Sequence, residues 1–277
     1  MSVWLIARLT FLEAQRRKLL WAVLLMGIIF LALFGIGFYF MYQDFVRFTD
    51  TNTRQFVEVS GMFLLIGLYV VNFLGVVLAI LISVDTIAGE ISSGTIQTVI
   101  TKPLRRWQIV IGKWLGLAIM LSLFIALMSA ALIGITWGIA HFTPRHAVEG
   151  VALMVLSGLV ILTLSIMGGT RLSTLTNGVV VFMAYGTAFV AGWMEQIGAF
   201  IRNVSAVDIG IAVSLLIPAE AIWKRAAYLM QPPSIRDLPV TPFSSASAPS
   251  PAMVVYALIY IAVMLAIALR LFQRRDL

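Results

Sequence analysis

The chain contains few side chains that could act as a catalyst or hold a metal ion. Its two histidines, His141 and His146, lack the HExxH spacing of a zinc protease, and a chain with no cysteine has neither a thiolate nucleophile nor a thiolate metal site. Gly112 and Lys113 lack the upstream glycine of a Walker A loop and are followed by Trp114. We therefore expect no catalytic residue, no metal site and no cofactor on this chain.

The charges that could bind a partner are concentrated in one short part of the sequence. Lys102, Arg105, Arg106 and Lys113 lie within twelve positions of one another. Such a basic cluster can contact an acidic groove of a protein or the headgroups of anionic lipids. The residues favour neither partner, so both interpretations stay open.

The amino-acid composition indicates that the chain consists largely of membrane-spanning segments. Of the 277 residues, 61% are hydrophobic and 11% are charged, whereas about a quarter of a typical soluble domain is charged. So few charges cannot cover a water-soluble surface, and the chain must be solvated largely by lipid. Six apolar stretches are long enough to cross roughly 30 Å of hydrocarbon. They cover residues 19–43, 59–84, 114–140, 150–170, 172–194 and 252–269.

The distribution of charge orients these spans. The segments on the side of the two termini hold 12 basic and 4 acidic residues, and the opposite side holds 7 basic and 8 acidic residues. Basic residues accumulate on the cytoplasmic side of membrane proteins. We expect a multi-pass protein of the inner (cytoplasmic) membrane with cytoplasmic N- and C-termini. The net charge of +7 then reflects orientation, not nucleic-acid binding.

Three segments complete a single transmembrane domain over residues 1–277. Residues 1–18 mix apolar and basic side chains at helical spacing, which predicts an amphipathic helix in the inner interface. Residues 85–113 form the main cytoplasmic loop, in which turn-forming residues bound a short helix. Residues 195–251 form the outer loop, whose apolar run at 209–219 is too short to span and predicts a re-entrant or interfacial segment. The expected fold is an all-α membrane protein with six transmembrane helices.

Small and polar side chains within the spans could line a path or join helices. Four small side chains recur every fourth residue in the third span, which would let another helix approach closely. They are Ser122, Ala126, Ala130 and Gly134. Tyr69 and Asn72 in the second span could line a polar path, and hydrogen bonding between helices explains them equally well. No charged residue lies inside an expected span, which weighs against a proton- or sodium-coupled carrier.

Three short motifs mark the cytoplasmic loop: DTIAGEISSGT at 85–95, KPLRR at 102–106 and IGK at 111–113. This pattern resembles the loop of type 2 permeases of ATP-binding cassette (ABC) exporters. The stretch LIPAEA at 216–221 and the C-terminal FQRRD also look like that family, so the resemblance covers essentially the whole chain. The chain is similar to permeases associated with the maturation of multicopper enzymes such as nitrous oxide reductase.

The resemblance implies the membrane-spanning subunit of an exporter that uses ATP hydrolysed by another chain. A cytoplasmic ABC ATPase would hold ATP and Mg²⁺ and grip a coupling helix at about residues 93–101. A second permease, identical or homologous, would pair with this one, residues 1–18 would form an elbow helix, and the outer loop would hold extracellular re-entrant helices. The residues expected at the ATPase interface are Glu90, Gly94, Thr95, Ile96, Thr98, Lys102, Pro103, Arg105 and Arg106. Within that set, Gly94 allows the tight entry turn, Thr95 starts the helix and Pro103 ends it.

Two other functions stay open at this point. A stand-alone channel or carrier would move its substrate without a partner, and a non-transporting scaffold would recruit an ATPase to the membrane. The exporter is favoured because no charged or paired polar residues are seen to line a path through the spans. Apolar and small side chains along a path would suit a hydrophobic or amphipathic cargo.

Overall fold

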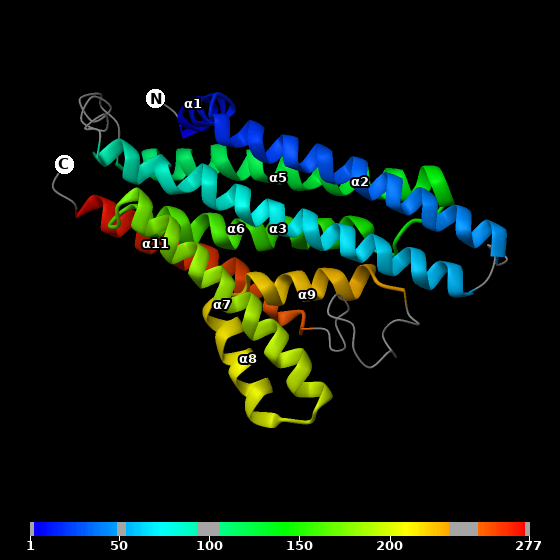
Figure 1. The fold of residues 1–277 in the computed structure, drawn as a ribbon. Helices are drawn as coiled ribbons and strands as arrows, with labels where there is room; N and C mark the ends of the chain where they lie inside the picture. Colours follow the sequence, from blue (N-terminus) through cyan, green and yellow to red (C-terminus); the bar gives the residue numbers. More distant parts are fainter. Residues whose placement is uncertain (1–2, 49–53, 93–105, 233–248, 275–277) are drawn as a thin grey trace.

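In a computed structural model, the chain is described at residues 3–48, 54–92, 106–232 and 249–274, and these residues form a helical bundle (Figure 1). Six of the helices are long and apolar enough to cross a membrane. They are α2 (Lys18–Phe48), α3 (Arg54–Ser92), α5 (Arg106–Ala140), α6 (Ala147–Gly169), α7 (Thr174–Phe200) and α11 (Ala252–Gln273). The expectation of an all-α protein with six candidate spans is confirmed.

Several of these helices extend beyond the apolar stretches from which they were predicted. Helix α3 continues past residue 84 to Ser92, and α5 begins at Arg106, before residue 114. The extensions carry Glu90 and Lys113, which form an ion pair with each other. Opposite charges that pair in this way can be accommodated near the ends of spanning helices.

Three shorter helices complete the described part of the chain: α1 (Val3–Gln15), α8 (Val204–Leu216) and α9 (Ala219–Met230). Helices α8 and α9 meet at a bend of 107°. Proline disfavours helical geometry in the residue before it, and Ile217, which precedes Pro218, has φ −138° and ψ 90°. The apolar segment expected at 209–219 is therefore part of a broken helix pair, with the geometry of a broken span or a re-entrant loop.

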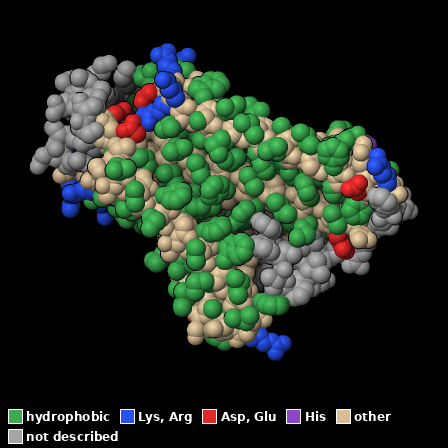
Figure 2. Space-filling view, in the orientation of Figure 1, with side chains coloured by type: hydrophobic (Ala, Val, Ile, Leu, Met, Phe, Trp, Pro, Cys, Tyr) green, Lys and Arg blue, Asp and Glu red, His purple; other side chains and the backbone are tan. Residues whose placement is uncertain are grey.

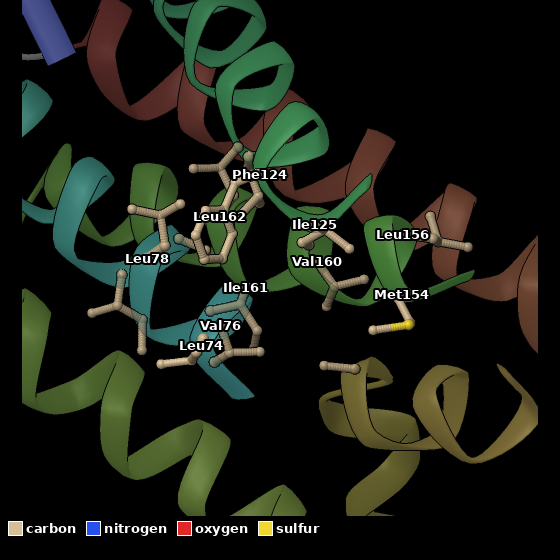
Figure 3. Close-up of a cluster of buried hydrophobic side chains, with 14 of the residues drawn as sticks. Leu74, Val76, Leu78, Phe124, Ile125, Met154, Leu156, Val160, Ile161 and Leu162 are labelled. Atoms are coloured by element: carbon tan, nitrogen blue, oxygen red, sulfur yellow. The ribbon is translucent and has the colours of Figure 1, made fainter. Parts of the chain in front are cut away.

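The core lies where α3, α5 and α6 pack together (Figure 3). Lipid tails are as apolar as leucine, so close packing holds membrane helices together more than the hydrophobic effect does. Glycine makes the close approach feasible here: a Cβ atom on Gly75 of α3 would lie 2.9 Å from Ile125 of α5, and one on Gly158 of α6 would lie 3.1 Å from the same side chain. The labelled core residues are Leu74, Val76, Leu78, Phe124, Ile125, Met154, Leu156, Val160, Ile161 and Leu162.

The ends of the bundle differ from its middle. Helix α1 and the C-terminal end of α11 lie at the same end (Figure 1), which we call the terminal end. Charged side chains gather at the two ends of the bundle, and hydrophobic side chains cover most of the visible surface between them (Figure 2). Helices α7 and α8 pack on each other and lean away from the bundle as a hairpin (Figure 1).

Candidate functional site

The two helices that flank residues 93–105 are joined near the terminal end. Glu90 of α3 forms an ion pair with Lys113 of α5, and the Lys113 Nζ atom also donates a hydrogen bond to the carbonyl oxygen of Thr86 at 3.0 Å. The Lys113 side chain is 7% exposed and that of Glu90 is 23% exposed. A buried ammonium needs such partners, because removing it from water is costly. The ends of α3 and α5 on either side of residues 93–105 are therefore tied to each other.

This arrangement corrects one expectation from the sequence. Lys113 was grouped with the basic residues that could meet a partner or lipid, but the structure buries it against Glu90 and Thr86. Charge and sequence position could not distinguish it from its neighbours, because its burial depends on how α5 packs against α3.

The other residues expected at the ATPase interface are only partly described. The Arg106 Nη1 atom donates to the carbonyl oxygen of Gln273 at 3.1 Å, which ties the start of α5 to the end of α11. The remaining expected residues lie outside the described part of the chain. They are Gly94, Thr95, Ile96, Thr98, Lys102, Pro103 and Arg105.

Helix α1 packs directly on α5 at the terminal end. A Cβ atom on Gly112 would lie 2.7 Å from the Cβ atom of Ile6, and one on Gly116 would clash with the backbone oxygen of Ala7. The two glycines are four residues apart, so they share one face of α5. Helix α1 therefore packs on the same part of α5 that carries Lys113.

A second polar cluster joins α1, α3 and α7. Arg17 lies 3.0 Å from Glu13 and 3.5 Å from Asp85, and Thr174 Oγ1 donates to Asp85 Oδ1 at 3.3 Å. About half of the Asp85 side chain is exposed, so each contact is weak. These residues line the rim of a cavity of about 920 Å³, whose walls are mainly apolar side chains of α3 and α7.

The residues proposed to line a path have different surroundings. Ala126, Ala130 and Gly134 are exposed and line a hollow of about 610 Å³ on the surface of α5 and α6. No described atom of another element lies within 4 Å of a Cβ built on Gly134, so this glycine does not pack against another described helix. Ser122, which belongs to the same stripe, donates to the carbonyl oxygen of Ala118 in its own helix at 2.7 Å.

Tyr69 and Asn72 lie elsewhere, on α3. The ring of Tyr69 packs edge-on against Trp223 of α9 at a centroid distance of 5.4 Å and also meets Phe189 of α7 at 6.1 Å. Asn72 is 2% exposed. Neither residue lines the hollow that holds the α5 stripe, so the two sets do not form a single path within the described chain.

Sequence analysis missed a buried charged cluster formed by Glu195, Glu220 and Lys224. The Lys224 Nζ atom of α9 donates to Glu195 Oε2 of α7 at 2.7 Å, and Glu220 is 5% exposed. Glu195 lies in helix α7, one residue beyond the span expected at 172–194, so this cluster adjoins the end of that expected span. The only signal in the sequence was the spacing of Glu220 and Lys224, four residues apart on one helix face.

These features define a class of protein: an integral membrane protein of six spans whose charged groups lie at the ends of the bundle or in paired clusters. The chain belongs to the ABC-2 family of transporter proteins, whose family model matches residues 4–277. A shorter segment is similar to the probable ABC transporter permease protein NosY of Stutzerimonas stutzeri, with 39% identity over 82 residues. That segment is 30% of this chain and 27% of NosY. The resemblance seen in the sequence is confirmed, and the chain is a membrane permease component of an ABC transporter.

Proposed function

We propose that this permease is the membrane-spanning subunit of an exporter driven by a separate cytoplasmic ABC ATPase. The family membership supports the permease role. The observation that carries the coupling role is the Glu90–Lys113 ion pair, which joins the helices on either side of residues 93–105. A force applied to that loop by a partner would act on α3 and α5 together.

The same helices can carry such a movement across the membrane. Helix α3 has 39 residues, which corresponds to a length of roughly 58 Å. One of its faces borders the cavity of about 920 Å³ between α3 and α7. A tilt of α3 relative to α7 would change the width of this cavity, which provides a route from ATPase closure to altered access.

The proposal includes a second permease, identical or homologous. Helix α8 is apolar, and of its thirteen residues only Gly210 is buried within this chain. Its exposed side chains include Ile209, Ile211 and Leu216. A partner permease would cover part of this surface and leave the rest to lipid.

Co-purification with the cognate ATPase tests the coupling role. We expect the double variant Lys102→Glu/Arg105→Glu to lose ATPase binding, because it reverses the charge of the loop. The matched control is Arg145→Glu, an exposed basic residue in the connection between α5 and α6, which should bind normally. The coupling assignment is wrong if the loop variant binds the ATPase as well as wild type does and stimulates its ATP hydrolysis equally.

Reconstitution of the permease alone distinguishes an exporter subunit from a stand-alone channel or carrier. Reconstituted alone in liposomes, the chain should conduct no ions or fluorescent solutes, whereas a channel or carrier would do so without an ATPase.

A further inference from the structure

An aromatic cavity of about 350 Å³ lies between α3 and α7. Its size falls within the range of roughly 300–1,000 Å³ that is typical of small-molecule sites. We define the aromatic cavity by all of its lining residues, of which five are aromatic. They are Tyr69, Val70, Phe73, Phe182, Tyr185, Gly186 and Phe189.

Three of these rings, those of Tyr69, Tyr185 and Phe189, form a cluster that extends to a third helix. Phe189 lies 6.1 Å from Tyr69 and 6.5 Å from Tyr185 between ring centroids. Tyr69 in turn packs against Trp223 of α9 at 5.4 Å. The cavity is therefore bordered by ring faces and edges of α3 and α7, and α9 closes the cluster behind Tyr69.

The carboxylate of Glu220 lies next to this aromatic cluster. A Cβ atom on Gly192 of α7 would be 2.8 Å from Glu220 Cγ, so Glu220 sits directly on α7 one turn beyond Phe189. On α9, Trp223 follows Glu220 by three residues, which places both on one side of that helix.

In the described part of the chain, Glu220 shares one nearby cation with a second carboxyl group. The cluster has one cation, Lys224, and two carboxylates, and the Lys224 ammonium bonds to Glu195 at 2.7 Å. Among the described residues, no hydrogen-bond donor reaches Glu220 Oε2, although this atom is buried. A buried carboxylate oxygen without a partner is costly, so the site gains stability when a positive group approaches.

We propose that the aromatic cavity and Glu220 form a binding site for a hydrophobic organic cation. Aromatic faces attract cations, and the attraction is strongest where water is excluded. A cation that approaches would favour the ionised form of the buried Glu220 carboxyl, whereas an anionic ligand would meet repulsion from it. A metal ion fits less well, because the described residues hold no group of three or more His, Asp or Glu side chains that could coordinate one.

Equilibrium binding to the full chain in lipid nanodiscs tests this site. The probe is radiolabelled tetraphenylphosphonium, and tetraphenylborate serves as an anion of the same shape. Empty nanodiscs correct for partition of both probes into lipid. We expect saturable binding of the cation and none of the anion.

Two variants remove the charge and the space separately. Glu220→Gln keeps the shape of the side chain and should weaken cation binding by about tenfold or more. Gly186→Leu should fill the cavity, because no described atom beyond the adjoining backbone of α7 lies within 4 Å of a Cβ built there. It should abolish binding while all charges remain. The control Glu149→Gln removes a carboxylate that is 64% exposed and distant in sequence from the cavity, and it should bind like wild type.

The outcomes decide the matter in either direction. Weakened binding in Glu220→Gln and lost binding in Gly186→Leu, with wild-type binding in Glu149→Gln, establishes the site. Wild-type affinity in either cavity variant, or equal binding of the anion, overturns it. These measurements need neither ATP nor an ATPase, so their result is independent of the proposed exporter role.

Discussion

Lys113 of α5 is buried against Glu90 of α3, and this ion pair links the two helices that flank residues 93–105. Its second contact, to the Thr86 carbonyl oxygen at 3.0 Å, anchors the ammonium to the α3 backbone as well. A pair in this position stabilises the permease by itself and does not depend on a bound ATPase.

Removal of the Glu90 carboxylate should therefore destabilise the isolated permease. We expect Glu90→Ala to lower the free energy of unfolding by about 3 kcal/mol, because it leaves the Lys113 ammonium buried without its charged partner. Unfolding in mixed micelles measures the effect. The swapped variant Glu90→Lys/Lys113→Glu should recover part of the loss. Unchanged stability of Glu90→Ala would mean that the pair has no structural role.

The contact between α1 and α5 can be tested by replacing two glycines of α5, one inside the contact and one outside it. Gly116→Val should cost about 2 kcal/mol, because the new side chain would overlap the α1 backbone at Ala7. Gly138→Val is the matched control, since no described atom beyond the adjoining backbone of α5 lies within 4 Å of a Cβ atom there. Limited proteolysis should cleave between α1 and α2 faster in the first variant only. Equal cleavage rates in both variants would contradict the packing of α1 on α5.

A hydrogen bond between spans can be measured at Thr163. The Trp114 indole donates from Nε1 to Thr163 Oγ1 at 2.8 Å, and hydrogen bonds between membrane helices contribute about 1 kcal/mol or less. Thr163→Val should therefore lower stability by about that amount. Thr187→Val removes a hydroxyl that bonds only its own helix, to the Met183 carbonyl oxygen at 2.8 Å, and its effect should be smaller. A larger loss of stability in Thr187→Val would mean that the Thr163 hydroxyl does not stabilise the contact between helices.

The exposed pair of Arg17 and Asp85 should behave differently from the buried pair. Its atoms lie 3.5 Å apart and the Asp85 side chain is 52% exposed, so water competes for both charges. A double-mutant cycle with Arg17→Gln and Asp85→Asn should give a coupling energy below about 1 kcal/mol that decreases with added salt. A coupling energy that stays large in high salt would show that the pair is shielded from water.

The orientation of the chain is testable because the natural sequence has no cysteine. Single cysteines at Arg16 and Glu149 should react with a membrane-impermeant maleimide from opposite sides. In intact spheroplasts, Glu149→Cys should be labelled at once and Arg16→Cys only after lysis. The reverse order would overturn the cytoplasmic placement of the termini.

The family of this protein and its membrane spans could be predicted from the sequence. A membrane-spanning helix can be recognised from a contiguous stretch of sequence, since each span needs about 20 apolar residues in a row. The motifs between residues 85 and 113 are likewise contiguous, and they were sufficient to indicate the ABC-2 family. Both kinds of signal are readable because they depend on neighbours along the chain.

The partners of charged side chains could not be predicted, because they depend on contacts between distant helices. Lys113 was grouped with the basic residues that could meet a partner or lipid, and no motif in the sequence singled out Lys224, yet each is buried against a carboxylate of another helix. The small side chains of α5 suggested packing, yet Gly134 faces open space. The sequence by itself therefore determined which segments enter the membrane and to which family they belong. The tertiary structure alone decided which charges are buried, because burial follows from the rotation and tilt of each helix against its neighbours.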